Sequence, residues 1–440
     1  MRTRLWTLLA LTLLFSSIMA ASAFASPALQ EITQDGAEEF AQQSVEEGRQ
    51  IFRFDTFGSE AFWGDSLQLH KAIAGEAIGG VGPGVSPNTA LSLGLKVDAN
   101  ALPTTLVEQI EAGNVNLDDP ATTVELLRLN AVVGVRGFFT PEGGLQSVGI
   151  TCAICHSVVD DSFAPGIGNR LDGWANRDLD IGQIIAIAPN LQPVADSLGV
   201  DVPTVRQVVT AWGPGKFDAE LFLDGKGFRP DGKTAATLIP AAYGLAGSSL
   251  HTWTGWGNVT HWNAFVANLE MHGIGRFYDP RLNDPEKFPV AVRNGLFDVR
   301  GQPDLISDKL IPLHLYQLSI EAPEPPAGSF DPVAAQRGQE LFNGKAGCAN
   351  CHVPPLFFEP GWPIHSAEQM GVDDFQAMRG PTGGYKTMPL KGLWAHQKGG
   401  FYHDGRYPDL VEVVLHYNTL MNLNLNIQEV GDLAEYLKSL

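Results

Sequence analysis

The sequence predicts a mainly α fold, in which two similar helical domains follow an additional N-terminal helical region. Apolar residues recur at helical spacing in several segments, whereas alternating polar and apolar runs that would mark strands are few. The same short cysteine motif occurs twice, and a helical segment closes the region behind each copy. The segments expected to be helical are residues 31–54, 122–135, 305–320, 332–344 and 428–440.

The N-terminal helices carry recognisable signals. Residues 31–54 place apolar side chains at helical spacing, and residues 122–135 do so after the start signal Asp118-Asp119-Pro120. The Gly/Pro-rich residues 79–84 lie between them. We expect a plain loop there, because the run has neither the Lys-Ser/Thr pair of a P-loop nor Rossmann spacing.

Two Cys-x-x-Cys-His pentads use all 4 cysteines of the chain: Cys152-Ala-Ile-Cys155-His156 and Cys348-Ala-Asn-Cys351-His352. The pentad is the attachment signature of c-type haem, in which each thiol adds to a vinyl group and the His ligates the iron. A shared zinc site is disfavoured by the wide separation of the pairs. Thioredoxin-like pairs would need a βαβ setting, and structural disulfides would not need a His after both pairs. The sequence therefore predicts two covalently bound c-type haems, with His156 and His352 as iron ligands.

The pentads and their closing helices define two cytochrome c-like units with insertions. The first haem domain is expected over residues 149–322 and the second over residues 333–440. Residues 323–332 form a Pro-rich linker between them. Residues 26–148 contain no cofactor motif, and we expect a helical layer over the first haem domain or part of a substrate channel.

Residues 1–25 have the three parts of a secretory signal peptide. Arg2 and Arg4 supply the basic start, residues 5–20 the apolar core, and cleavage is expected near Ala25. A retained membrane anchor is the less favoured alternative, because the apolar run is short and interrupted by Ser. No other stretch is long and apolar enough to span a bilayer. We expect an exported protein in the periplasm, where c-type haem is attached.

The composition limits the partners. The formal net charge is −20, which argues against binding nucleic acid or anionic lipid. It suits a soluble protein, and it also suits a basic redox partner such as a small cytochrome or a cupredoxin. With 440 residues, 44% of them hydrophobic, the chain is large enough for two or three domains.

Three runs near the C-terminus, at residues 385–392, 401–406 and 409–418, resemble a known family. The second run contains Tyr402-His403-Asp404-Gly405, and the whole of residues 333–440 resembles the superfamily of bacterial dihaem cytochrome c peroxidases, which includes MauG and the dihaem rubber oxygenases. A second resemblance covers residues 236–275. The long N-terminal region and the wide haem spacing look more like the rubber oxygenases, whose longer C-terminal portion is missing here.

The resemblance implies roles for several residues. The His156 haem would be the reactive one, and the His352 haem would feed or store electrons. Glu270, in a run similar to the peroxidases' Asn-Pro-x-Glu-Met, would be the distal acid, which moves a proton between peroxide oxygens. Trp253 would be an electron relay or a wall of the haem pocket, or it serves packing alone.

The sixth ligand of the second haem stays open between three residues. Tyr417 falls where the peroxidases place Met and MauG-like enzymes place Tyr. Met388 and His416 are the other candidates. A phenolate would favour Fe(III), whereas a thioether would raise the potential. Arg406 is expected to neutralise haem propionates, and Arg170 and Arg177 are further candidates, each weighed against a surface salt bridge. The list of expected cofactor-binding residues is thus Cys152, Cys155, His156, Trp253, Cys348, Cys351, His352 and Arg406.

The leading functional prediction is a periplasmic dihaem c-type cytochrome oxidoreductase of peroxidase type, acting on a small oxidant such as hydrogen peroxide. A pure electron carrier with both irons six-coordinate is one alternative, and a dioxygen-activating oxygenase is another. An open distal position at the first haem would indicate an enzyme, and two ligands on both irons would indicate the carrier.

Overall fold

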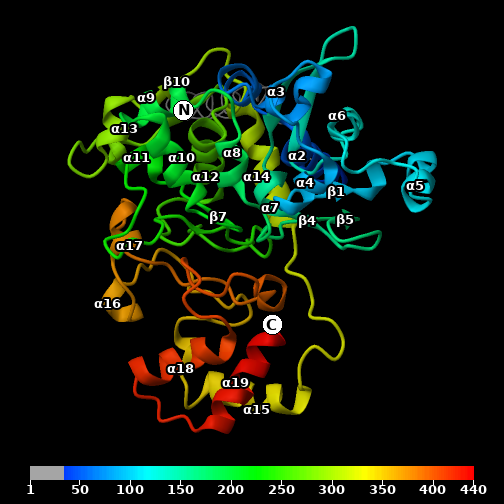
Figure 1. Cartoon of the computed structure of the whole chain (residues 1–440). Coiled ribbons are helices and arrows are strands. Elements are labelled where there is room, and N and C mark those ends of the chain that lie inside the picture. Colours follow the sequence, from blue (N-terminus) through cyan, green and yellow to red (C-terminus); the bar gives the residue numbers. More distant parts are fainter. Residues whose placement is uncertain (1–33) are drawn as a thin grey trace, which may run out of the picture. The chain divides into compact units, whose positions relative to one another are not determined.

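The computed structural model describes residues 34–440 of the chain (Figure 1). The chain divides into two units, residues 1–43 and residues 44–440, and all contacts given below lie within the second. The signal peptide predicted over residues 1–25 lies outside the described residues. Among residues 34–440, no helix is long and apolar enough to cross a membrane.

Helices predominate over strands in the described part of the chain, as predicted. Several of them begin behind an Asp, Asn or Ser whose side chain accepts a backbone N–H of the first turn. The α-helices are α2 (Gln34–Phe54), α3 (Leu69–Ala74), α4 (Pro87–Ser92), α5 (Thr104–Glu111), α6 (Pro120–Arg128), α7 (Ala153–His156), α8 (Ile181–Ala186), α9 (Gln192–Leu198), α10 (Val202–Thr210), α11 (Leu221–Asp224), α12 (Val259–Phe265), α13 (Pro289–Arg293), α14 (Leu310–Ser319), α15 (Pro332–Asn343), α16 (Ala367–Met370), α17 (Phe375–Arg379), α18 (Leu410–Leu420) and α19 (Ile427–Lys438).

Wider and tighter helical turns complete the helical structure. The π-helical turns are η2 (Ala61–Ser66) and η5 (Val266–Glu270). The 3₁₀ turns are η3 (Glu76–Ile78), η4 (Ala99–Ala101), η6 (Pro280–Leu282), η7 (Ser307–Lys309), η8 (Cys348–Asn350) and η9 (Leu393–His396).

The strands are short and occur as separate pairs. The longest pair is the antiparallel hairpin of β2 (Val135–Phe139) and β3 (Leu145–Ile150), with an irregularity between Phe138 and Phe139. The other antiparallel pairs are β4 (Ser157–Val159) with β6 (Arg170–Asp172), β7 (Lys216–Phe217) with β8 (Thr237–Leu238), and β9 (Arg276–Tyr278) with β10 (Asp298–Arg300). The pair of β1 (Val97–Asp98) and β5 (Ile167–Gly168) is parallel. None of these pairs forms a larger sheet, so the hydrophobic cores are built mainly by helices.

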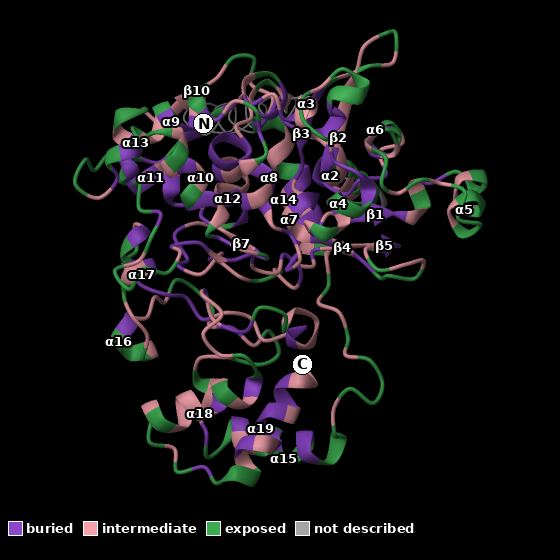
Figure 2. Cartoon of the chain, in the orientation of Figure 1, coloured by how far each residue is buried: buried purple, intermediate pink, exposed green. Residues whose placement is uncertain are grey.

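Helices α15 and α19 cross in close contact in the C-terminal part of the chain (Figure 1), and Figure 2 shows the buried side of α19. The contact depends on Gly338, where a Cβ atom would lie only 2.0 Å from the carbonyl oxygen of Asp432. One turn further on, Phe342 meets Tyr436 edge to face, with ring centroids 5.2 Å apart. The absence of a side chain at Gly338 therefore sets how closely the two helices approach.

The same arrangement occurs between α2 and α14. A Cβ on Gly48 would lie 2.0 Å from the carbonyl oxygen of Pro312, and Phe52, one turn further on, meets Tyr316 edge to face at 5.5 Å. The sequence pattern Gly-x-x-Ile/Leu-Phe is shared by α2 and α15. We call residues 44–322 the N-terminal half and residues 333–440 the C-terminal half. Each half thus contains one such helix pair, and in the N-terminal half the pair begins with α2, far ahead of residue 149.

We expect Gly338→Ala to destabilise the C-terminal half by about 1–3 kcal/mol, because the added methyl group must push backbone apart in a packed contact. Gly431→Ala is the matched control on α19, since nothing lies within 4 Å of a Cβ at that position. In a helix that change stabilises by roughly 0.5–1 kcal/mol. Denaturant unfolding of the two variants checks the difference, and equal midpoints would contradict the close contact.

Two of the predicted helices have other bounds in the structure. The helix predicted at 305–320 begins only at Leu310, behind the 3₁₀ turn η7, and ends at Ser319. The helix predicted at 122–135 begins earlier, at Pro120, and ends at Arg128, because the chain turns there and enters β2 at Val135. Residues 320–331, which include most of the predicted linker, contain no helix or strand. The two largest hydrophobic cores each contain side chains of one pentad, Cys152 and Cys155 in the first and Cys348 in the second.

Candidate functional site

Both pentads line one cavity of about 710 Å³ within residues 44–440. All four cysteines and both pentad histidines face it, and all four cysteines are free thiols. The size is typical of a small-molecule or cofactor site, and the lining is predominantly apolar. The structure therefore brings together the two motifs that the sequence separates.

The first pentad stands on the short helix α7. Its backbone is fixed from the following loop, since the amide of Gly173 donates to the carbonyl of His156 (2.8 Å) and that of Asn176 donates to the carbonyl of Cys155 (2.9 Å). Burial lowers the pKa of His156 to about 4, only partly offset by the carbonyl of Pro240. The imidazole is therefore neutral at pH 7, as an iron ligand must be.

The second pentad begins with the 3₁₀ turn η8, behind Gly347 in the left-handed region (φ +65°). Burial lowers the pKa of His352 to about 4. Its Nδ1 lies 3.2 Å from the carbonyl oxygen of Phe357. A ring held at Nδ1 by a backbone carbonyl presents Nε2 for ligation, which is the arrangement expected of a metal-bound histidine.

The thiols line the cavity wall, and the four cysteines are half-buried. Burial raises the pKa of Cys152 and of Cys155 to about 12, and that of Cys348 to about 11. At pH 7 these side chains are therefore neutral thiols and poor nucleophiles. This disfavours thiol–disulfide chemistry and is compatible with thiols that serve as covalent attachment points.

Glu270 lies at the end of the π-helical turn η5 and lines the same cavity. The turn is held by Trp63, whose indole N–H donates to the carbonyl of Met271 (2.9 Å), and by Asn268, which donates to the carbonyl of Ala264 (2.8 Å). The Glu270 side chain is buried, and neither carboxyl oxygen has a hydrogen-bond partner. Burial raises its pKa well above the ordinary value, which favours the protonated form of the carboxyl group.

Two buried cations in the cavity wall have no carboxylate partner. Arg177 makes one long hydrogen bond, to the carbonyl of Lys398 (3.4 Å), and its Nε has none. Lys386 makes one at 3.3 Å, to the carbonyl of Thr387. Burial lowers the pKa of Arg177 to about 10 and that of Lys386 to about 7. A buried cation without a counter-charge is costly, so the cavity is suited to a ligand that brings anionic groups.

Of the other expected cofactor contacts, some line the cavity and others are held in ion pairs with carboxylates. Trp253 lines the cavity and donates its indole N–H to the carbonyl of Leu238 (2.9 Å). Arg406 is not among the lining residues, and its guanidinium binds Asp404 and Asp373. Arg170 pairs with Asp98. Contact of Arg406 with a propionate stays a prediction, while Arg177 is the predicted arginine that faces the cavity.

The three candidate sixth ligands are also placed differently. Tyr417 and Met388 line the cavity. His416 is not among the lining residues, because its Nε2 lies 2.8 Å from the carbonyl oxygen of Met370. Burial raises the pKa of Tyr417, and the thiols of the second pentad act in the same direction. The choice between Tyr417 and Met388 stays open.

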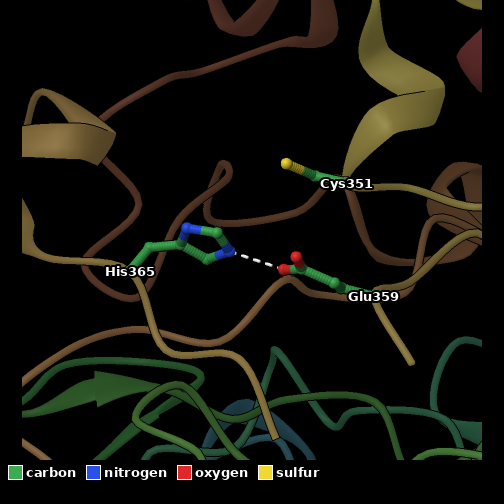
Figure 3. A group of neighbouring side chains, drawn as sticks. All are labelled: Cys351, Glu359 and His365. Atoms are coloured by element: carbon green, nitrogen blue, oxygen red, sulfur yellow. Dashed lines mark hydrogen bonds and ion pairs between the residues drawn. The ribbon is translucent and has the colours of Figure 1, made fainter. Parts of the chain in front are cut away.

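Two groups of side chains in residues 34–440 bring potential metal-ligating atoms within 4.8 Å of one another. The first, Cys351, Glu359 and His365, is drawn in Figure 3, where His365 and Glu359 point to each other at 2.5 Å. Its thiol belongs to the second pentad. In the second group, Asp373 and Asp404 already pair with arginines. Neither group therefore defines a separate metal centre.

The residues present fit c-type haem. The thiols, the neutral histidines and the unpaired cations of the cavity supply the attachment points, the iron ligands and the counter-charges that such a group needs. Sequence reasoning missed Lys386, although it lies in the run 385–392 that carries the family resemblance. The run also contains Lys391, and no local signal shows which of the two lysines is buried.

No protein-family model matches the chain, and no curated protein does. Among solved structures, the chain is similar to Kuenenia stuttgartiensis hydrazine synthase pressurised with 20 bar xenon, at 22% identity and a TM-score of 0.24; the match covers 36% of this chain and 60% of that one. It is also similar to a MauG-like protein associated with microbial copper homeostasis, at 17% identity and a TM-score of 0.30, over 52% of this chain and 78% of that one. Similarity this low does not define the fold, so the function is argued from the chain's own residues.

Proposed function

We propose that the chain is a periplasmic dihaem c-type cytochrome that reduces peroxide, with the reactive haem on the first pentad and an electron-transfer haem on the second. One observation carries the proposal: both pentads open into one cavity whose wall also holds a buried, unpartnered carboxyl group, Glu270. A cytochrome that only carries electrons has no use for such a group.

The chain's residues would divide the work between them. Cys152, Cys155 and His156 would hold the first haem, and Cys348, Cys351 and His352 the second. Bound haem iron would supply one-electron exchange and, at the first pentad, a position for a small oxidant. Glu270 can give a proton to one oxygen of a peroxide and accept a proton from the other.

The surroundings of the second pentad fit electron transfer. Tyr417 and Met388 face the cavity and either could fill the remaining iron position. The net charge of −20 favours a basic electron donor, for which a small cytochrome or a cupredoxin is suitable. Export to the periplasm is part of the proposal, since haem attachment to the pentads requires it.

Electron paramagnetic resonance of the haem-loaded protein tests the division of labour. We expect one high-spin ferric signal, from the His156 haem, and one low-spin signal. The high-spin signal should change when hydrogen peroxide is added. Two low-spin signals that ignore peroxide, in both the oxidised and the half-reduced protein, would replace this function with that of an electron carrier.

Lys386→Met should lower the reduction potential of the second haem by about 60 mV, which is a tenfold change in the one-electron equilibrium. Below pH 7, where Lys386 with its pKa of about 7 is positively charged, loss of that charge makes the added electron less stable, so the reduction potential falls. Redox titration followed in the visible spectrum measures the shift. Lys345→Met is the control, because Lys345 is already neutralised by Glu429 at 2.7 Å. Equal shifts in both variants would contradict the placement of Lys386.

A further inference from the structure

A second set of buried acids lies next to Glu270. Asp218, Glu220 and Asp224 lie in and beside the short helix α11, and each is almost completely buried. Glu220 also lines the cavity that contains Glu270. Charge repulsion between Glu220 and Glu270 raises the pKa of Glu270, as does the charge of Asp218, so the groups act on one another.

One cation faces these acids, and it comes from the C-terminal half. Arg379, at the end of α17, binds Asp224 in a two-pronged pair (2.8 and 2.9 Å) and Asp218 through one contact (2.9 Å). Its side chain is 1% exposed. A single guanidinium thus stands among four buried carboxyl groups, including Glu270. Were all of them ionised, most of the negative charge would have no counter-charge away from water, at high cost.

Several oxygen atoms of this group have no donor. They are both oxygens of Glu270, Oδ2 of Asp218 and Oε1 of Gln376, whose amide hydrogen-bonds to Glu220. A buried ionised carboxylate can only accept, whereas a protonated one can also donate. Protons would therefore both remove the excess charge and provide the missing donors.

A bound cation is the other way to neutralise such a group. The geometry disfavours it, because the metal-competent groups within the described residues are the two given above and neither includes these acids. Protonation agrees with the local electrostatics. Burial raises the pKa of Asp218 to about 7 and also raises the pKa of Glu220, with Arg379 opposing and the neighbouring acids reinforcing the shift.

We propose that Asp218 and Glu220 form a proton store behind Glu270, and that Arg379 from the C-terminal half sets its charge. The inference rests on the proposed peroxidase function and adds the source of its protons. Glu270 is the group that meets peroxide, and Asp218 and Glu220 act through it by reloading it.

The store matches the chemistry of the reaction. Reduction of hydrogen peroxide breaks the O–O bond and gives two water molecules, which takes up two protons and two electrons. The electrons would come singly from a reduced donor protein, and a haem held by the second pentad would pass them on. The protons would come from the store during the reaction and be replaced from solvent afterwards.

Infrared spectroscopy of the haem-loaded protein, without peroxide, tests the store directly. At pH 7 we expect C=O stretching bands of protonated carboxyl groups that shift in deuterium oxide and disappear as the pH rises. Glu220→Gln should remove one band. Glu111→Gln, at an exposed acid of α5, should leave all bands unchanged. Absence of such bands in the wild type, or an unchanged spectrum in Glu220→Gln, would overturn the proposal. The pH titration of the wild type decides even if the variant does not fold.

Proton uptake during turnover separates this inference from the proposed function. When the reduced protein is mixed with peroxide and a pH indicator, the haem spectrum should change before protons are taken up from solvent. In the double variant Asp218→Asn/Glu220→Gln, the change in the haem spectrum should slow roughly tenfold and should coincide with proton uptake from solvent. If the haem spectrum of the wild type changes at the same time as protons are taken up from solvent, the proposed proton store is overturned. A wild type that keeps its carboxyl bands but does not react with peroxide would instead overturn the peroxidase function, and with it proton delivery to peroxide.

Discussion

Replacing both thiols of the first pentad, Cys152→Ser with Cys155→Ser, should leave a protein with one covalent haem in place of two. Each thiol that lines the cavity is an attachment point, and a hydroxyl group cannot form the thioether. Haem content per protein, measured by denaturing absorbance and by intact mass, should fall by half. This is the largest effect that we expect from any change in the chain.

The matching variant of the second pentad, Cys348→Ser with Cys351→Ser, should also lose one haem and keep the other. The two variants then carry different single haems, and comparison of their spectra assigns each signal to its pentad. Retention of two covalent haems in either variant would contradict the assignment of the pentads.

Glu270→Gln should slow the reaction with peroxide at least about a hundredfold while both haems remain bound, because a positioned acid contributes that much to proton transfer. The amide has nearly the same shape as the acid but cannot give up a proton. Stopped-flow mixing with hydrogen peroxide measures the rate, and the surface variant Glu111→Gln should keep the wild-type rate.

The pH dependence gives an independent check on Glu270. Burial raises its pKa, so the protonated form is lost at a higher pH than that of an ordinary glutamic acid. The wild-type rate should therefore fall on the alkaline side, and the residual rate of Glu270→Gln should lack that fall. A variant with the same alkaline limb as the wild type would show that another group titrates.

The sequence predicted what is local in the structure. The pentads, the helix α15 to within one residue and the helical character of the chain follow from motifs, caps and apolar spacing. The end of α6 was predicted wrongly, because the turn from α6 into β2 depends on the hairpin that follows. Boundaries set by pairing with later residues are not visible in a local window.

The parts that could not be predicted depend on contacts between distant segments. Arg379 meets Asp218 and Asp224 across more than a third of the chain, and no spacing rule relates them. The contact of Gly48 with Pro312 is of the same kind. It places α2 in a helix pair like that of α15 and α19, so α2 resembles the opening helix of a domain, whereas the predicted boundary at residue 149 stays a prediction.

Mixing the half-reduced, haem-loaded protein with one equivalent of hydrogen peroxide tests the central claim most directly. If the cavity is a peroxidase site, the absorbance of the first haem, assigned from the single-haem variants, will change within the mixing time, and the second haem will be oxidised with it. If both haems keep their spectra, the cavity does not admit or cleave peroxide, and the proposed function is wrong.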